Sequence, residues 1–369
     1  MIIREKTLLK LKLSRRSEVP PCRKMLESAF CRCEKTTWTR VKRRLRFLML
    51  LLTLGLFLFT FYASSLDMSW RLTAGHNTIN TSVPDVSADA PVVYVVAYPN
   101  QYSIIVDEPL RCGQEKPFLV LMIPVAPDDR KARDTIRDTW GKETTVLGRE
   151  VSHYFLLGMN KGEHGTGNIN EQVLEESRKH HDVLQSDFLD SYNNLTIKTM
   201  VMFEWLSSRC PNASYAMKID SDIFLNVRNL VNVLLTAPRR EYLSGLVVRD
   251  SPVLRDQTSK WFLPFSVFPE SYFPTYAQGL GYVFSLDLPK RILEASAHVK
   301  AVYIEDVYVG MCMMHLGIAL TDPPHGDLFR GEMHHEPSGC YWTSVITTIL
   351  ENSDHLSRVW SVYQSQNGC

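Results

Sequence analysis

Two short acidic motifs contain the side chains that are best suited to metal binding or catalysis. Asp220 and Asp222, separated by one serine, follow the apolar run Tyr215–Ile219. Two carboxylates at the end of a strand can bind one hard divalent cation, and that cation can bridge two phosphates of a nucleotide. The same D-x-D pattern also occurs in turns with solvated carboxylates, so on its own it leaves both readings open.

The second motif is Glu305-Asp306, which has apolar residues on both sides and opens a helix-like segment. A carboxylate partly withdrawn from water at the start of a helix suits a general base. The alternative is helix capping, because acidic residues favour the first turn of a helix.

A basic pair forms the third candidate. Arg133 and Arg137 are spaced by one helical turn, and Trp140 falls close to the same face. Two guanidinium groups on one face can hold a phosphate or the ribose–uracil part of a nucleotide. The alternative is a solvated face on which Asp134 and Asp138 pair with the arginines.

Alternating strands and helices must position these residues. Apolar runs predict strands at 118–125, 151–157, 182–184 and 215–219, and periodicity predicts helices at 130–140, 170–179, 195–209 and 227–235. This succession predicts an α/β domain with a mainly parallel sheet. Ligands in such sheets bind at the carboxyl ends of strands, where Asp220 and Asp222 fall.

An uncharged apolar stretch at residues 47–63, extendable to 66, is close to the minimum length that spans a bilayer. Lysines and arginines cluster before it, and such clusters stay on the cytoplasmic side. We therefore expect a cytoplasmic tail at 1–46, a transmembrane signal anchor at 47–66, a luminal stem at 67–111 and a catalytic domain at 112–369. The alternative, a buried helix of a soluble protein, would show a polar face.

The part after this stretch has features of a domain in an oxidising compartment. Its cysteines are Cys112, Cys210, Cys312, Cys340 and Cys369. Most should pair, and the odd count leaves at least one free or bonded to another chain. The N-x-S/T sequons predict glycosylation at Asn80, Asn194 and Asn212. The net charge of only +1 over 369 residues gives no indication of nucleic-acid binding, which requires an excess of basic residues.

A series of segments, in order, resembles the motifs of β-1,3-glycosyltransferases. These segments are 132–141 (ARDTIRDTWG), 155–158 (FLLG), 187–199 (DFLDSYNNLTIKT), 218–226 (KIDSDIFLN), 260–261 (KW), 279–285 (GLGYVFS) and 305–310 (EDVYVG). The resemblance covers residues from about 112 to 369. The last two forms resemble the galactosyltransferase branch more than the N-acetylglucosaminyl branch.

The resemblance implies a GT-A-type nucleotide-sugar transferase domain in the Golgi membrane. It implies UDP-galactose as donor, Mn²⁺ as cofactor, and inversion to a β-1,3 linkage on a GlcNAc- or GalNAc-terminated glycan of a glycoprotein or glycolipid. It makes Asp222 the main metal ligand and places Asp220 near the ribose and the water shell of the metal. Asp306 would be the base, with Glu305 beside it.

The resemblance also implies a set of substrate-binding residues: Arg133, Arg137, Trp140, Asp220, Lys260, Trp261, Gly279 and Gly281. The two arginines would shape the nucleotide pocket, and Trp261 would lie on the sugar side.

Two positions depart from the family pattern. The cysteine that usually precedes the G-x-G-Y block is absent from 276–278, which explains the odd cysteine count. Ile349 takes the place of a metal-binding histidine. His334 and His335 are either substitute ligands from a nearby loop or solvated loop histidines. Two other functions therefore stay open: a UDP-GlcNAc or UDP-GalNAc transferase, and a weak or inactive homologue that acts as a binding partner.

Overall fold

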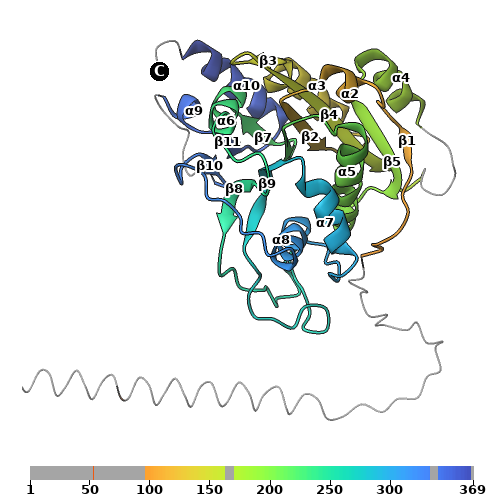
Figure 1. Cartoon of the computed structure of the whole chain (residues 1–369), viewed down its shortest axis with the longest axis vertical. Coiled ribbons are helices and arrows are strands. Elements are labelled where there is room, and N and C mark those ends of the chain that lie inside the picture. Colours follow the sequence, from red (N-terminus) through yellow and green to blue (C-terminus); the bar gives the residue numbers. More distant parts are fainter. Residues whose placement is uncertain (1–52, 54–95, 163–169, 333–339, 367–369) are drawn as a thin grey trace, which may run out of the picture. The chain divides into compact units, whose positions relative to one another are not determined.

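The computed structural model describes residues 53, 96–162, 170–332 and 340–366 (Figure 1). These residues, apart from residue 53, belong to a compact unit assigned to Asp89–Cys369. Among the described residues, no helix has the length and apolarity needed to cross a membrane. The expected anchor at 47–66, apart from residue 53, lies outside the described residues, and Asn80, His334, His335 and Cys369 lie outside them too.

A mixed eight-stranded sheet forms the centre of this unit (Figure 1). Its order is β1-β5-β4-β2-β6-β9-β8, and β3 pairs with β4. The strands are β1 (Ile104–Val106), β2 (Leu119–Pro124), β3 (Thr145–Val146), β4 (Arg149–Met159), β5 (Val183–Leu189), β6 (Tyr215–Ile219), β8 (Leu243–Val248) and β9 (Tyr276–Ser285).

The prediction of a mainly parallel sheet holds only for the middle of this sheet. Strands β5, β4, β2 and β6 are parallel, whereas β1, β3, β8 and β9 pair antiparallel with their neighbours. The loop at 249–275 joins β8 to β9 without a crossover helix, so the chain returns in the opposite direction.

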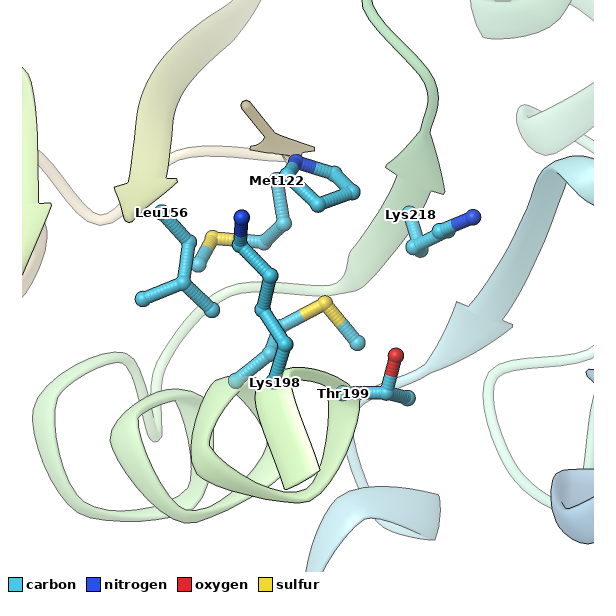
Figure 2. A pocket seen from close by; sticks show the side chains of 7 residues that line it. Met122, Leu156, Lys198, Thr199 and Lys218 are labelled. Atoms are coloured by element: carbon cyan, nitrogen blue, oxygen red, sulfur yellow. The ribbon is translucent and has the colours of Figure 1, made fainter. Parts of the chain in front are cut away.

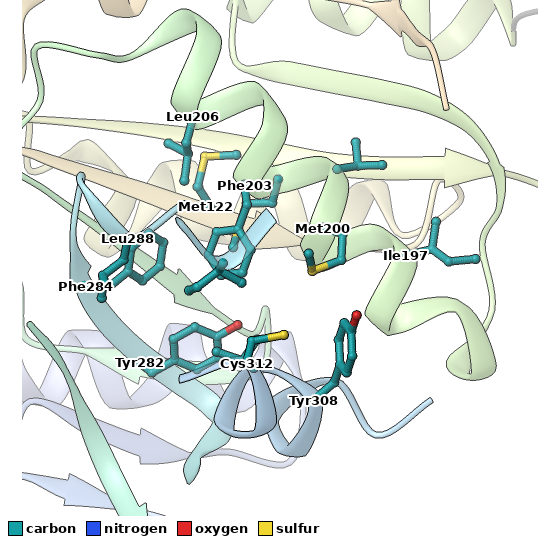
Figure 3. Packing of buried hydrophobic residues seen from close by; sticks show 14 of the residues in the cluster. Met122, Ile197, Met200, Phe203, Leu206, Tyr282, Phe284, Leu288, Tyr308 and Cys312 are labelled. Carbon is teal, nitrogen blue, oxygen red and sulfur yellow. The ribbon is translucent and has the colours of Figure 1, made fainter. Parts of the chain in front are cut away.

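Helices cover both faces of the sheet, which is why the parallel strands are continuous apolar runs. Successive side chains of β2 enter different clusters: Met122 packs with α5, α7 and α8 (Figure 3), and Leu121 packs with α3, α6 and α10. The helices are α2 (Arg111–Glu115), α3 (Arg130–Asp138), α4 (Glu171–His180), α5 (Leu195–Arg209), α6 (Val227–Leu234), α7 (Leu288–Ser296), α8 (Glu305–His315), α9 (Tyr341–Ser344) and α10 (Ser353–Ser365), with 3-10 turns η1 (Trp140–Lys142) and η2 (Tyr192–Asn194).

A small second sheet connects the C-terminal part to the D-x-D motif. It contains β10 (Phe329–Arg330), β11 (Thr347–Ile349) and β7 (Ile223–Leu225), and β7 begins directly after Asp222. Ile349 is the register partner of Ile223, and the Leu350 N–H donates to the Asp222 carbonyl at 2.8 Å. Ile349 therefore lies beside the motif, at a position where its side chain is 37% exposed.

The folded unit begins before Cys112. Strand β1 pairs with β5, and Val96 is buried in the core, so residues 96–111 belong to the fold rather than to a separate stem. A disulfide joins Cys112 in α2 to Cys210 at the end of α5, and Cys340 is also disulfide-bonded. Cys312 is free and buried, which confirms the prediction of an unpaired cysteine.

Candidate active site

The D-x-D motif lies at the carboxyl end of β6, as predicted. The Asp220 N–H donates to the Leu280 carbonyl of β9, which fixes the turn against the neighbouring strand. The Asp220 side chain is 41% exposed, and Asp222 is exposed. Desolvation by the surrounding protein, and then the Asp220 carboxylate, raise the pKa of Asp222. Two acidic side chains thus lie together at the surface of the site.

Lys218 connects the two acidic motifs. Its ammonium is buried and lies 2.6 Å from Asp220 Oδ1 and 3.0 Å from Glu305 Oε1, and it also contacts the Gly279 carbonyl oxygen. One cation therefore joins β6, β9 and the start of α8. Sequence reasoning gave Lys218 no role, although a lysine inside an apolar strand requires a buried partner.

Glu305 is almost fully engaged by its neighbours. Its Oε2 accepts hydrogen bonds from Tyr282 at 3.1 Å and from Thr199 at 3.2 Å, while Oε1 faces Lys218. Burial raises the pKa of Glu305 to about 7, even though Lys218 lowers it. A carboxylate held by three protein donors at 6% exposure does not face a substrate.

Asp306 is the more accessible member of the pair. Its Oδ2 accepts from the Gly279 N–H at 2.8 Å and its Oδ1 from the Val307 N–H at 2.8 Å, but neither oxygen has an ion-pair partner among the described residues. Burial raises the pKa of Asp306, and the Gly279 N–H opposes that shift. A carboxylate held in place and given a raised pKa fits the predicted role of general base.

The two glycines assigned to substrate binding differ in their surroundings. A Cβ on Gly279 would lie 3.0 Å from Glu305 Oε1 and 3.3 Å from Asp306 Oδ2, so only glycine lets the acidic pair approach β9 this closely. A Cβ on Gly281 would lie 2.9 Å from the methyl carbon of Met217 on β6. Gly281 therefore serves strand packing, and its predicted contact with substrate finds no support in its position.

The predicted direct contact of Arg133 with a nucleotide conflicts with its burial. Arg133 is 1% exposed and bonds both oxygens of Glu176 and the carbonyls of Ala126 and Pro127. Arg137 pairs with Glu176 and Asp182, besides the expected pair with Asp134. Arg133 therefore influences the site only indirectly, by holding the loop that follows β2.

We expect Arg133→Met to destabilise the fold rather than to weaken ligand contact directly. The change removes both Arg133 bonds to the buried Glu176, which keeps only Arg137 at 2.7 Å and the more distant Arg130, and it leaves two loop carbonyls without their donor. Breaking a buried ion pair costs about 3–5 kcal/mol. Arg130→Met is the matched control, because Arg130 is 42% exposed and reaches Glu176 only at 3.6 Å. Thermal unfolding of both variants checks this. If Arg133→Met keeps its stability but loses UDP affinity, Arg133 contacts the nucleotide directly.

Trp140 is also fully buried, so its ring does not face a ligand as predicted. Its indole N–H donates to the Ile223 carbonyl at 3.1 Å. This bond holds the first residue of β7, directly after Asp222. Trp140 is therefore a positioning residue for the D-x-D turn.

Lys260 and Trp261, predicted on the sugar side, are exposed in the loop before β9. The ammonium of Lys260 lies 4.6 Å from the centroid of the Trp261 ring and 5.8 Å from that of Tyr192. Tyr192 therefore lies on the same side of the site as Lys260 and Trp261. The sequence motif that contains Tyr192 did not predict a role for it.

A small cavity of about 10 Å³ lies behind Lys218, between the sheet and α5 (Figure 2). It is close to the least volume that holds one water, and is far too small for a nucleotide. Lys198 lines it with its stem, and its ammonium bonds Asp190 at 2.7 Å and the Val125 carbonyl at 2.9 Å. This bond also fixes the segment after β2.

Among the described residues, no group of three or more His, Cys, Asp or Glu side chains could hold a metal ion. The two exposed carboxylates of Asp220 and Asp222 nevertheless fit a cation that takes its other ligands from a diphosphate and water. One oxygen of Asp220 is held by Lys218, and the apolar Ile349 lies beside Asp222. The residues present therefore fit a metal carried largely by the substrate.

The two described sequons differ in their surroundings. Asn194 is half-buried, its amide donates to the Leu189 carbonyl at 2.8 Å, and Thr196 of the same sequon is buried with its hydroxyl on Val302. Asn212 is exposed in the turn between α5 and β6.

We expect a glycan on Asn212 and none on Asn194, because only the Asn212 amide is free to leave the surface. Removal of N-glycans with an endoglycosidase should shift the gel mobility of the wild-type chain. Asn212→Gln should shorten that shift by one glycan, while Asn194→Gln should leave it unchanged. A shortened shift in Asn194→Gln would contradict this assignment.

Comparisons with known proteins identify relatives of the chain. Residues 131–324, just over half of the chain, match the galactosyltransferase family. The chain is 37% identical to "Beta-1,3-galactosyltransferase 1" of mouse, over 73% of this chain and 80% of the relative. It is also 37% identical to "Beta-1,3-galactosyltransferase 2" of Pongo abelii and of human, over 74% of this chain. It spans 65% of the length of those two relatives.

Among solved structures, 4-diphosphocytidyl-2C-methyl-D-erythritol synthase of Anaerococcus prevotii covers 56% of this chain and 87% of its own. Its identity is 13% and its TM-score 0.33, a likeness too distant to carry an argument. The chain belongs to the galactosyltransferase family.

Proposed function

We propose that the chain transfers galactose from UDP-galactose to a GlcNAc- or GalNAc-terminated glycan and forms a β-1,3 linkage with inversion. The observation that carries this is the Lys218 bridge, which brings Asp220 and the Glu305-Asp306 pair into one site. The likeness to two named β-1,3-galactosyltransferases supports the donor and the linkage. The carboxylates at strand ends and the mixed α/β sheet support a GT-A-type domain.

In this reaction the Asp306 carboxylate takes the proton of the acceptor hydroxyl. The acceptor oxygen then forms a bond to C1 of galactose, the bond between C1 and the diphosphate oxygen breaks, and UDP leaves with the electron pair. A single displacement inverts the anomeric centre from α to β. Glu305 and Lys218 hold the start of α8, so that Asp306 keeps its position.

The cofactor we propose is Mn²⁺, held by Asp222 and Asp220 together with the diphosphate. When bound, it neutralises charge on the departing diphosphate. Asp220 also stays tied to Lys218, so one oxygen of this carboxylate is oriented before the donor binds.

We further propose a single-pass type II arrangement in the Golgi membrane, with residues 47–66 as the anchor. The uncharged stretch and the basic residues before it support this orientation. The disulfide between Cys112 and Cys210 supports an oxidising, luminal environment for the folded unit.

A donor panel tests the proposed function. The purified full chain in detergent is incubated with UDP-galactose, UDP-GlcNAc or UDP-GalNAc and a GlcNAc or GalNAc glycoside, with and without Mn²⁺. We expect transfer from UDP-galactose that depends on Mn²⁺. Transfer from UDP-GlcNAc but not from UDP-galactose would replace the donor assignment. UDP binding without any transfer would favour an inactive homologue that acts as a binding partner. The apolar Ile349 beside Asp222 supports this alternative.

A further inference from the structure

Two aromatic rings stay exposed beside the acidic site. Tyr192, the first residue of η2, is 43% exposed, and Trp261 is 46% exposed. The ammonium of Lys260 lies over both rings, at 5.8 Å from the Tyr192 centroid and 4.6 Å from the Trp261 centroid. The two rings are therefore neighbours although they come from distant parts of the sequence.

Tyr303 ties these rings to the catalytic helix. Its hydroxyl lies 2.9 Å from the carbonyl oxygen of Lys260 and 2.8 Å from that of Phe262, which holds the loop on both sides of Trp261. Its ring meets Tyr192 edge to face at 6.4 Å between centroids. Because Tyr303 stands two residues before Glu305, the exposed rings have a fixed position relative to the start of α8.

The Asp306 carboxylate acts electrostatically on the Tyr192 hydroxyl. Partial burial raises the pKa of this hydroxyl most, and the Asp306 carboxylate raises it further. The Trp261 side chain lowers this pKa through a hydrogen bond.

We propose that Tyr192 and Trp261 form a platform for the terminal pyranose ring of the acceptor. The inference rests on the proposed function and names one of its subsites. A pyranose has an apolar C–H face and a polar edge of hydroxyls, which matches exposed aromatic rings beside a few polar groups. The acceptor is the better occupant than the donor sugar, because its reacting hydroxyl must reach Asp306 in the first turn of α8, directly after the segment through which Tyr303 positions both rings.

Steady-state kinetics of Tyr192→Ala and Tyr192→Phe test the platform. Loss of the ring in Tyr192→Ala should raise the KM for the acceptor about tenfold, while the KM for UDP-galactose stays within about twofold. Tyr192→Phe keeps the ring and should retain the wild-type acceptor KM. Tyr272→Ala is the control, because Tyr272 is 60% exposed on the same loop and pairs through its backbone with Pro252.

Two kinetic outcomes would overturn the platform. A higher KM for UDP-galactose with an unchanged acceptor KM would move Tyr192 to the donor side. A loss in Tyr192→Phe equal to that in Tyr192→Ala would show that the hydroxyl, not the ring, matters.

Binding separates this inference from the proposed function. Saturation-transfer NMR with a GlcNAc glycoside and UDP should show acceptor contact in the wild type and a much weaker signal in Tyr192→Ala. If the wild type transfers no sugar but this difference persists, the proposed function fails and the platform stands. Equal signals from both proteins would contradict the platform.

Discussion

Replacing Asp306 by asparagine should lower kcat by about 10²–10⁴-fold while UDP binding stays nearly unchanged. Asparagine has nearly the same size, and its single amide oxygen can accept one of the two N–H bonds from Gly279 and Val307. Lys218 and Glu305 still hold the start of α8. Asparagine cannot take a proton from the acceptor hydroxyl. Single-turnover transfer and calorimetric UDP titration measure the two effects separately.

Asp322→Asn is the matched control, since Asp322 is 63% exposed and pairs with Arg249 on the surface. It should leave kcat unchanged. If Asp306→Asn keeps near-wild-type turnover, the base is another group. If it loses UDP binding as strongly as turnover, the residue acts on the donor instead.

The pH profile gives an independent check of the same residue. Burial raises the pKa of Asp306 above the ordinary aspartate value of about 3.9. The base is active only when ionised, so kcat should fall as the pH drops through this raised pKa. We expect the acidic limb of the kcat profile above the ordinary range, and its absence in Asp306→Asn. A limb at the ordinary value would contradict the raised pKa.

Lys218→Met should have the second large effect, on both stability and activity. It leaves the buried Glu305 without its cation and releases Asp220, and breaking a buried ion pair costs about 3–5 kcal/mol. UDP affinity and kcat should both fall, because both acidic motifs lose their common anchor. Lys131→Met is the control, since Lys131 pairs with Asp354 at the surface, where ion pairs contribute about 0–1 kcal/mol.

The loss of stability in Lys218→Met should depend on pH. Burial already raises the folded-state pKa of Glu305 to about 7, and removing Lys218 raises it further. A group with a raised folded pKa contributes stability below its unfolded pKa and loses it as the pH rises through the folded value. The gap in melting temperature between variant and wild type should therefore widen from about pH 6 to about pH 8.

The double variant Lys218→Met with Glu305→Gln separates the two consequences. Removing the orphan charge should recover part of the stability lost in Lys218→Met, but activity should stay low because Asp220 remains unanchored. A double variant no more stable than the single one would show that the ion pair between Lys218 and Glu305 does not carry the effect.

Local patterns predicted the central fold well. The apolar runs gave β2, β4 and β6 within a few residues, and helical periodicity gave α3 and α5, whose ends coincide with Asp129 as N-cap and with Cys210. Strand β5 is longer than predicted, because Gln185 and Ser186 are polar yet fully buried in its middle. The antiparallel strands at the edges of the sheet depend on pairing between distant residues, which the local hydrophobic periodicity of the sequence does not predict.

The site was predicted less evenly. Asp220, Asp222 and Asp306 lie where sequence reasoning placed them, since strand ends and helix starts are local features. Burial is not local, so Arg133 and Trp140 were assigned to ligand contact although both are enclosed. The same limit hid Lys218 and Tyr192, whose partners are distant in the sequence.

The configuration of the product tests the account most directly. The full chain, UDP-galactose and a GlcNAc glycoside are incubated with Mn²⁺, and the first product is examined by NMR for its anomer and linkage position. The single displacement assisted by Asp306 predicts a β-linked galactose, and the likeness to β-1,3-galactosyltransferases predicts the 3-hydroxyl as the linkage position. An α-linked product would require retention and would contradict the account.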